Sequence, residues 1–305
     1  MARVLTLAIP AENRTELLDH LQGIDGVVAI SVQVGGSSRP DGDVITVQAT
    51  NRAAERIFGV MQTMKIAKGS CIAMSELTAL VAPDDRGPVQ NERNESPWEE
   101  VETLLRRETN LSLNYLLLMT LAGAVAAVGL QQDQLHIVIG AMLIAPGFEP
   151  LVRIVFGPVT GVWSEMRKGL VSTLVGYLML AIGSAIGFLL AITVAPAPWG
   201  DVLDQHWIEF WSSFSWAGVL TALLAGLAGS AVVTSRETVF ATGVMVALAL
   251  IPSMAIFGLG LAAGDLELAM RGLARWALEA FLVLLAAGAG VLAKQALLHH
   301  RKTLP

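Results

Sequence analysis

Four long stretches of this 305-residue chain carry no Asp, Glu, Lys or Arg, and they limit the folds open to it. They are residues 109–132, 169–200, 210–235 and 238–264. Each exceeds the roughly 20 residues that a helix needs to cross the hydrocarbon core of a bilayer. Apolar residues make up 54% of the chain and charged residues only 15%, which is unusual for a soluble protein. The sequence therefore predicts an α-helical polytopic membrane protein.

The hydrophobic part of the chain contains an internal repeat. When residues 113–192 are moved forward by 103 positions, Leu121-Ala122-Gly123 coincides with Leu224-Ala225-Gly226. We expect three membrane spans in each copy, and because three is odd, the second copy must cross the membrane in the opposite sense. This inverted-repeat plan is typical of secondary transporters. The shift also superposes structural glycines, namely Gly140 on Gly243, Gly157 on Gly260, Gly161 on Gly264 and Gly169 on Gly272.

The expected transmembrane domain covers residues 112–295, with repeats at about 112–194 and 214–295. Its six predicted spans are 112–130, 135–160, 169–194, 214–233, 238–262 and 272–295. Basic residues gather in the connections on the amino-terminal side, whereas the opposite side has only Arg271 and Arg275, both in its third loop. The positive-inside rule then predicts that both termini face the cytoplasm. Gly183 and Gly187, four residues apart, favour close helix packing.

Residues 1–82 have the pattern of a separate soluble domain. Alternating apolar residues predict strands at 5–9, 28–34, 44–50 and 72–81, and helical spacing predicts helices at 12–22 and 53–64. The order β-α-β-β-α-β is the ferredoxin-like α+β arrangement. We expect a cytosolic domain that either supports packing and oligomerisation or senses a ligand. Cys71, the only cysteine, is expected to be a buried strand residue.

Residues 83–111 connect the two predicted domains. The segment 83–97 is rich in Pro, Asp, Asn, Glu and Arg, which is typical of a flexible linker. A helix is expected to follow, with Ser96 as N-cap and Pro97 at its first position. Its apolar stripe includes Trp98, Val101 and Leu105 and favours a position at the membrane surface, with a partner-binding helix as the alternative. Residues 296–305 are expected to form a cytosolic tail.

The run Ile139-Gly140-Ala141-Met142-Leu143-Ile144-Ala145-Pro146, the following Pro150, and the segment 247–252 before Gly264-Asp265 resemble a known family. It is the prokaryotic membrane family catalogued as domain of unknown function 389. The resemblance covers roughly residues 1–295 and implies the fold and a location in the prokaryotic cytoplasmic (inner) membrane, but no substrate. Family members usually carry a small or apolar residue at the position of Glu149 and an apolar one at that of Arg153.

The second predicted span contains the main candidate site. Pro146 and Pro150 each remove a backbone donor, so the helix is expected to kink or unwind between them, at Gly147. Glu149 lies inside this break, and Arg153 follows four residues later, where the two side chains would face each other. An ionisable residue within a span indicates a function by default. The two open interpretations are an ion or substrate site and a structural Glu149–Arg153 ion pair, with an oligomer contact as a minor third.

The second copy offers Pro252 and Ser253 at the corresponding break but no charge there, so a shared site would be asymmetric. Near the start of the last span, Arg275 and Glu279 are expected to form a surface ion pair. A phosphate-binding loop, a His-Glu-x-x-His metal motif and a nucleophile elbow are all missing from the sequence, which argues against an enzyme, a cofactor and a metal site.

The sequence therefore predicts a secondary transporter or permease for an ion or small molecule. We expect membrane lipids as its surroundings and a homo-oligomeric assembly. The formal charge of −6, without a basic stripe, gives no support to nucleic-acid binding. A membrane sensor or scaffold that transports nothing, and an oligomeric ion channel, remain as alternatives.

Overall fold

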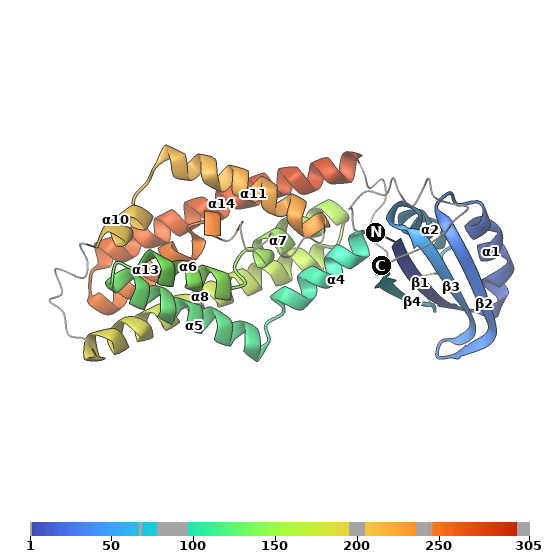
Figure 1. The fold of residues 1–305 in the computed structure, drawn as a ribbon, viewed down its shortest axis with the longest axis horizontal. Coiled ribbons are helices and arrows are strands. Elements are labelled where there is room, and N and C mark those ends of the chain that lie inside the picture. Colours follow the sequence, from blue (N-terminus) through green and yellow to red (C-terminus); the bar gives the residue numbers. More distant parts are fainter. Residues whose placement is uncertain are drawn as a thin grey trace. The chain divides into compact units, whose positions relative to one another are not determined.

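The computed structural model describes residues 2–66, 69–77, 97–194, 205–235, 244 and 246–297. The chain divides into two compact units, one within Met1–Glu100 and the other within Val101–Leu298 (Figure 1). Residues 83–96 of the predicted linker, residues 195–204 between the two predicted repeats and the end of the predicted tail lie outside the described residues.

The amino-terminal unit is built on a four-stranded antiparallel sheet. Its strands are β1 (Ala2–Ile9), β2 (Val27–Ser38), β3 (Asp41–Thr50) and β4 (Cys71–Glu76), in the spatial order β2-β3-β1-β4. A short 3-10 turn, η1 (Ala11–Asn13), leads into α1 (Arg14–Gln22), and α2 (Asn51–Thr63) follows β3 directly. The order β-α-β-β-α-β along the chain is the predicted one.

Alternating side chains place the core of this unit on one face of the sheet. Leu5, Leu7 and Ile9 of β1 are fully buried and belong to one cluster with apolar residues of α1 and α2. On the edge strand β4 the same alternation turns Ile72 toward this core and Cys71 away from it. The prediction of a buried Cys71 is therefore wrong, and the thiol is exposed.

The second unit is helical. Its elements are α4 (Trp98–Thr109), which begins in the first unit, α5 (Leu113–Gln131), α6 (Leu135–Ile144), α7 (Glu149–Thr160), α8 (Trp163–Val194), α10 (His206–Ser212), α11 (Trp216–Ser235), α13 (Leu250–Ala263) and α14 (Leu266–Leu297). The long helices run side by side in Figure 1, and contacts join α5 to α8, α11 to α14 and α13 to both α8 and α14.

Four of these helices, α5, α8, α11 and α14, are long and apolar enough to cross a membrane. The pair α6 and α7 forms a fifth candidate, bent by 41° at the break between them. Large apolar side chains such as Leu121, Leu174 and Leu224 are exposed on the long helices, as expected where lipid is the solvent. The apolar helices thus indicate a membrane protein. Six spans are not confirmed, because α13 has only 14 residues and part of the predicted span at 238–262 lies outside the described chain.

Helices α5 and α8 approach each other so closely that their backbones touch through glycines. A Cβ atom on Gly183 would lie 1.9 Å from the Thr120 carbonyl oxygen, and one on Gly123 would lie 2.0 Å from that of Leu180. Gly187 meets the backbone of Ala124 in the same way. The predicted close packing at Gly183 and Gly187 is confirmed at this seam.

Local structure recurs at the spacing of the sequence repeat. Helices α7 and α13 both end in a left-handed glycine, Gly161 with φ 85° and Gly264 with φ 77°, which is the usual C-terminal cap. A Cβ atom on Gly157 would lie 2.6 Å from the backbone nitrogen of Met166, and one on Gly260 would lie 2.7 Å from that of Ala269. Every member of these three pairs is 103 positions from its counterpart.

The two remaining glycine pairs of the sequence repeat differ in whether their members make equivalent contacts. Gly169 lies against the Pro150 carbonyl and Gly272 against the Ser253 carbonyl, again 103 positions apart. Gly140, by contrast, has open space where a Cβ would stand, so close packing does not explain it. Its counterpart Gly243 lies outside the described residues.

Candidate functional site

The break between α6 and α7 lies at residues 145–148, as the prolines predicted. Pro146 lies in the non-helical segment, and Pro150 occupies the first turn of α7, where a missing N–H costs little. The hydroxyl of Tyr177 on α8 donates a hydrogen bond to the Gly147 carbonyl at 3.1 Å. A carbonyl freed by the break is thus satisfied by protein, as irregular backbone in a membrane requires.

Phe148, at the end of the break, is fully buried and lies against α11. A Cβ atom on Gly229 of α11 would come within 2.1 Å of the Phe148 ring, so only glycine leaves room for it. The break in the first half of the unit is therefore held by a helix of the second half.

Glu149, the first residue of α7, has a buried carboxylate oxygen, Oε2, with no hydrogen-bond partner among the described residues. Its charge lies within electrostatic range of the hydroxyl groups of Tyr115 on α5 and Tyr177 on α8. A buried acceptor without a donor is unfavourable, and such groups often mark a place where a ligand, ion or proton binds. Glu149 remains a candidate for binding.

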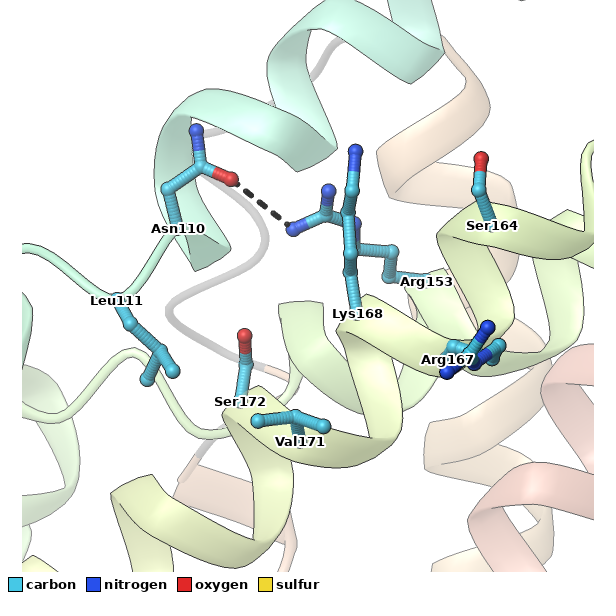
Figure 2. Close-up of a pocket in the computed structure, with 8 residues that line it drawn as sticks. All are labelled: Asn110, Leu111, Arg153, Ser164, Arg167, Lys168, Val171 and Ser172. Carbon is cyan, nitrogen blue, oxygen red and sulfur yellow. Dashed lines mark hydrogen bonds between the residues drawn. The ribbon is translucent and has the colours of Figure 1, made fainter.

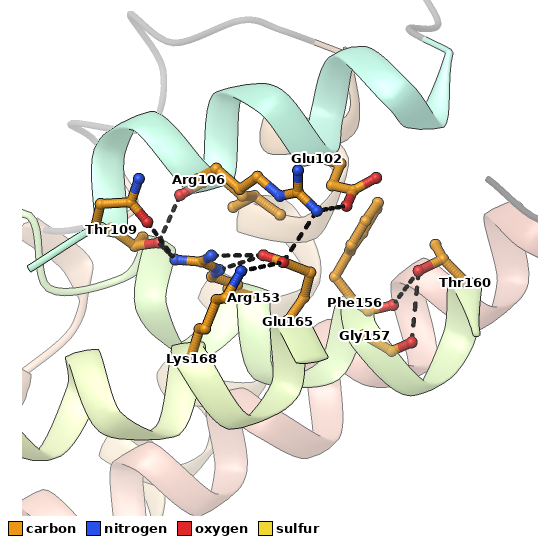
Figure 3. Close-up of polar contacts among 11 residues, drawn as sticks. Glu102, Arg106, Thr109, Arg153, Phe156, Gly157, Thr160, Glu165 and Lys168 are labelled. Atoms are coloured by element: carbon orange, nitrogen blue, oxygen red, sulfur yellow. Dashed lines mark hydrogen bonds and ion pairs between the residues drawn. The ribbon is translucent and has the colours of Figure 1, made fainter. Parts of the chain in front are cut away.

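Arg153 does not pair with Glu149, and the prediction that the two side chains face each other is wrong. Its guanidinium donates to Glu165 Oε2 on α8, from Nε at 2.8 Å and from Nη2 at 2.5 Å. Nη1 donates to Thr109 Oγ1 at 2.7 Å and to Asn110 Oδ1 at 3.3 Å. The side chains of Arg153 and Glu165 are both only 1% exposed (Figure 3). Because α7 and α8 are joined by the tight turn at Gly161, the chosen partner lies twelve residues away, not four.

Further charged groups extend this pair toward α4. Arg106 contacts Glu165 Oε1 at 3.1 Å and Glu102 at 2.5 Å, and Lys168 contacts Glu165 Oε1 at 3.3 Å (Figure 3). The carboxylate of Glu165 is thus surrounded by three cations. We interpret this cluster as a structural junction between α4, α7 and α8, because its central groups are buried and fully paired.

A second break precedes α13. Residues 246 and 247 are helical, 248 and 249 are not, and the helix resumes at Leu250, so this break begins 103 positions after the start of the first. Pro252 and Ser253 are buried in the first turn of α13. The Ser253 hydroxyl donates to the Ala249 carbonyl at 2.5 Å, which again satisfies a backbone oxygen near the break.

The sequence has no charged residue at the second break, but the structure brings charged residues of α14 to it. Arg275 Nη2 donates to Glu279 Oε1 at 2.8 Å, and both residues are buried, so the expected surface ion pair is a buried one. Glu279 lies beside the Ala249 backbone and within electrostatic range of Tyr177. Its Oε2, together with Arg275 Nε and Nη1 and Trp276 Nε1, has no hydrogen-bond partner among the described residues. The Trp276 ring lies 5.1 Å from that of Tyr177.

We group the buried polar residues at the two breaks as one polar cluster, which we define as Glu149, Tyr177, Ser253, Arg275 and Glu279. The Tyr177 hydroxyl touches the first break and lies within electrostatic range of both carboxylates. Carboxylate, hydroxyl and carbonyl oxygens are the groups that bind alkali cations and carry protons. Among the described residues, no group of three or more His, Cys, Asp or Glu side chains is placed to hold a metal ion.

The two halves fill the space beside this cluster in opposite ways. In the first half, Tyr115 of α5 lies over Gly176 of α8 and donates to the Ser172 carbonyl at 2.9 Å. In the second half, the position of Tyr115 is taken by Gly218, and the large side chain comes from Arg275 of α14, which lies over that glycine. The space is filled by a neutral phenol in one half and by an ion pair in the other.

Comparison with known proteins shows a similarity to one family. Residues 142–291 match the model described as Domain of unknown function (DUF389). The chain is also 26% identical over 251 residues to the uncharacterised protein MJ0678 of Methanocaldococcus jannaschii, which covers 82% of this chain and 74% of that protein. No solved structure matches the chain.

Sequence reasoning found Glu149 and both breaks but missed several residues of the site. Tyr115 and Tyr177 are the only two tyrosines, and a tyrosine inside an otherwise apolar span was a usable signal. Glu165 gave no such signal, because it stands beside Arg167 and Lys168 in a segment that reads as a solvated loop.

Proposed function

We propose that this protein is a secondary transporter that moves a small solute or ion across the prokaryotic inner membrane. One observation carries the proposal: two helix breaks begin 103 positions apart, and beside each lies a buried carboxylate with one oxygen that has no hydrogen-bond partner in the described part of the chain. Glu149 lies at the first break and Glu279 lies beside the second. Broken helices and intramembrane ionisable residues mark substrate and ion sites in such proteins.

We further propose that residues 112–194 and 214–295 are inverted three-span repeats. The recurring glycine caps and the equivalent contacts of Gly157 and Gly260 support this relation. Helix contacts also recur, because α5–α8 corresponds to α11–α14, and α7–α14 corresponds to α13–α8. In an alternating-access cycle, one repeat would rock against the other around the polar cluster.

The cluster favours a cation or a proton as the coupling species. Two carboxylates and one guanidinium leave one negative charge in excess when all are ionised, and a bound cation or a proton would neutralise it. The Tyr177 hydroxyl lies within electrostatic range of both carboxylates. We assign no catalytic residue and no cofactor to the protein.

For the rest of the chain, we propose that both termini are cytoplasmic, in line with the positive-inside rule. The amino-terminal unit has the strand order β2-β3-β1-β4 of a ferredoxin-like domain and would regulate the transporter or assemble it into a homo-oligomer.

The test is flux in proteoliposomes. Purified protein is reconstituted and challenged with a panel of ions and small metabolites under proton or sodium gradients. Glu149→Gln and Glu279→Gln, each first checked for a monodisperse gel-filtration peak, are expected to lower coupled uptake at least tenfold and to remove its dependence on the driving gradient. The control is Glu267→Gln, which changes an exposed glutamate of α14 and should leave uptake unchanged.

Three outcomes would contradict the proposal. Unchanged gradient dependence in both variants would remove the coupling role from the cluster. Flux of no solute, with ligand binding by the intact protein, would favour a sensor. Voltage-driven current far above carrier turnover would favour a channel.

A further inference from the structure

A basic pocket lies in the helical unit away from the polar cluster. It has a volume of about 380 Å³ and opens between the start of α8, Arg153 of α7 and the segment before α5 (Figure 2). Its polar lining includes Asn110, Arg153, Arg167, Lys168 and Ser172. The proposed transport cycle makes no use of this pocket.

The charges of the pocket favour an anion. Arg153, Arg167 and Lys168 all line it, and Arg167 forms no ion pair with any described residue. The nearby carboxylate of Glu165 is already shared among Arg153, Arg106 and Lys168, so it does not neutralise the whole set. Arg167 and Lys168 lie in the second turn of α8, which begins at Trp163, and the dipole at the start of this helix also attracts negative charge.

Apolar side chains continue from the pocket along α8 and distinguish a lipid from a free anion. Leu111 and Val171 line the apolar part of the pocket. Leu174 and Leu178 follow on α8, 56% and 54% exposed, on a surface suited to acyl chains. Trp163, at the start of the helix, is 63% exposed, as expected for a tryptophan at the headgroup level. A phosphate held by the cations would thus have its hydrocarbon tails directed along a lipid-facing helix.

The second half of the unit lacks this arrangement. At the positions 103 residues later, Arg153 is replaced by Ile256, Ser164 by Glu267 and Arg167 by Met270. Two cations stand at the equivalent positions, Arg271 in place of Lys168 and Arg275 in place of Ser172, and each is paired with a glutamate of α14. The basic pocket therefore belongs to one side of the membrane, the side that the positive-inside rule assigns to the cytoplasm.

We propose that this pocket binds the phosphate headgroup of an anionic phospholipid from the cytoplasmic leaflet. Arg167 and Lys168 contact the phosphate, and Arg153 contributes positive charge from α7. The acyl chains lie along Val171 and Leu174 of α8. Basic pockets between transmembrane helices on this side are suited to acidic headgroups.

The test measures lipid retention by native mass spectrometry of the full chain in detergent. Phosphatidylglycerol and phosphatidylcholine are titrated separately, and inorganic phosphate is added in a third arm. The variant Arg167→Gln/Lys168→Gln is compared with Arg107→Gln/Arg271→Gln, which removes two exposed guanidinium groups outside the pocket and gives the same net charge. We expect phosphatidylglycerol to bind more tightly than phosphatidylcholine, and the pocket variant to lose roughly 30-fold in affinity while the control does not.

Equal binding of the two lipids, or an equal loss in both variants, would overturn the proposal. Release of phosphatidylglycerol by millimolar inorganic phosphate would overturn it in favour of a soluble-anion site. Both variants keep the buried pair of Arg153 and Glu165, and the pocket variant removes only the contact of the exposed Lys168 with Glu165. A gel-filtration profile identical to that of the wild type verifies that the fold is kept.

Discussion

Replacing Glu165 by glutamine tests whether the buried pair with Arg153 holds the helical unit together. The amide keeps the shape of the carboxylate but removes its charge, while the Arg153 side chain stays only 1% exposed. Arg153 keeps its bonds to Thr109 and Asn110 and one acceptor oxygen at position 165, but no anion. Breaking a buried ion pair from one side costs about 3–5 kcal/mol. The remaining acceptors place Glu165→Gln near the lower end, at about 3 kcal/mol.

The assay is thermal unfolding in detergent, followed by the fraction of protein that remains monodisperse. For a unit of this size, about 3 kcal/mol corresponds to a fall in Tm of roughly 6–12 °C. Glu267→Gln is the control, because it removes the same kind of charge from an ion pair with Arg271 in which both side chains are more than half exposed. Exposed pairs contribute about 0–1 kcal/mol. Equal Tm values for the two variants would refute the reasoning, as would a failure of Arg153→Met/Glu165→Leu to recover stability relative to Glu165→Gln.

Two further predictions concern the seam and the break. Gly183→Ala should lower Tm by several degrees, because its Cβ would stand 1.9 Å from the Thr120 carbonyl oxygen. Gly140→Ala, with open space around it, should instead raise stability by up to about 1 kcal/mol through helix propensity. Differential scanning fluorimetry compares the two variants, and a similar shift in both would contradict the packing argument. Tyr177→Phe removes the donor to the Gly147 carbonyl and should cost about 1–3 kcal/mol; faster hydrogen exchange confined to the break would support this reason, and unchanged exchange and Tm would contradict it.

The features predicted best were those that depend on the local sequence or on the pattern of residues along one segment. Charge-free stretches located the long helices, because the absence of charge over roughly 20 residues is itself the physical requirement for a span. Prolines located the break before Glu149, since a missing N–H acts on its own helix. Gly161 and Gly264 stood out in the repeat, and both are left-handed caps, a role that few other residues fill.

Predictions that depended on tertiary contacts were less successful. Arg153 was matched with Glu149 by helical spacing, but the α7–α8 turn offers Glu165, with two hydrogen bonds to the same carboxylate oxygen. Arg275 and Glu279 were expected at the surface because both are charged. Spacing does predict their pairing, but their burial depends on the small Gly218 of a separate helix, which periodicity along one helix does not reveal.

The glycine seam between α5 and α8 has a mechanical consequence. Where backbones touch at Gly123, Gly183 and Gly187, no layer of side chains lies between the helices to change rotamer and allow sliding. The two helices are therefore expected to move as one rigid body during any conformational change. We expect relative motion at contacts between side chains and at the two breaks, and not between α5 and α8.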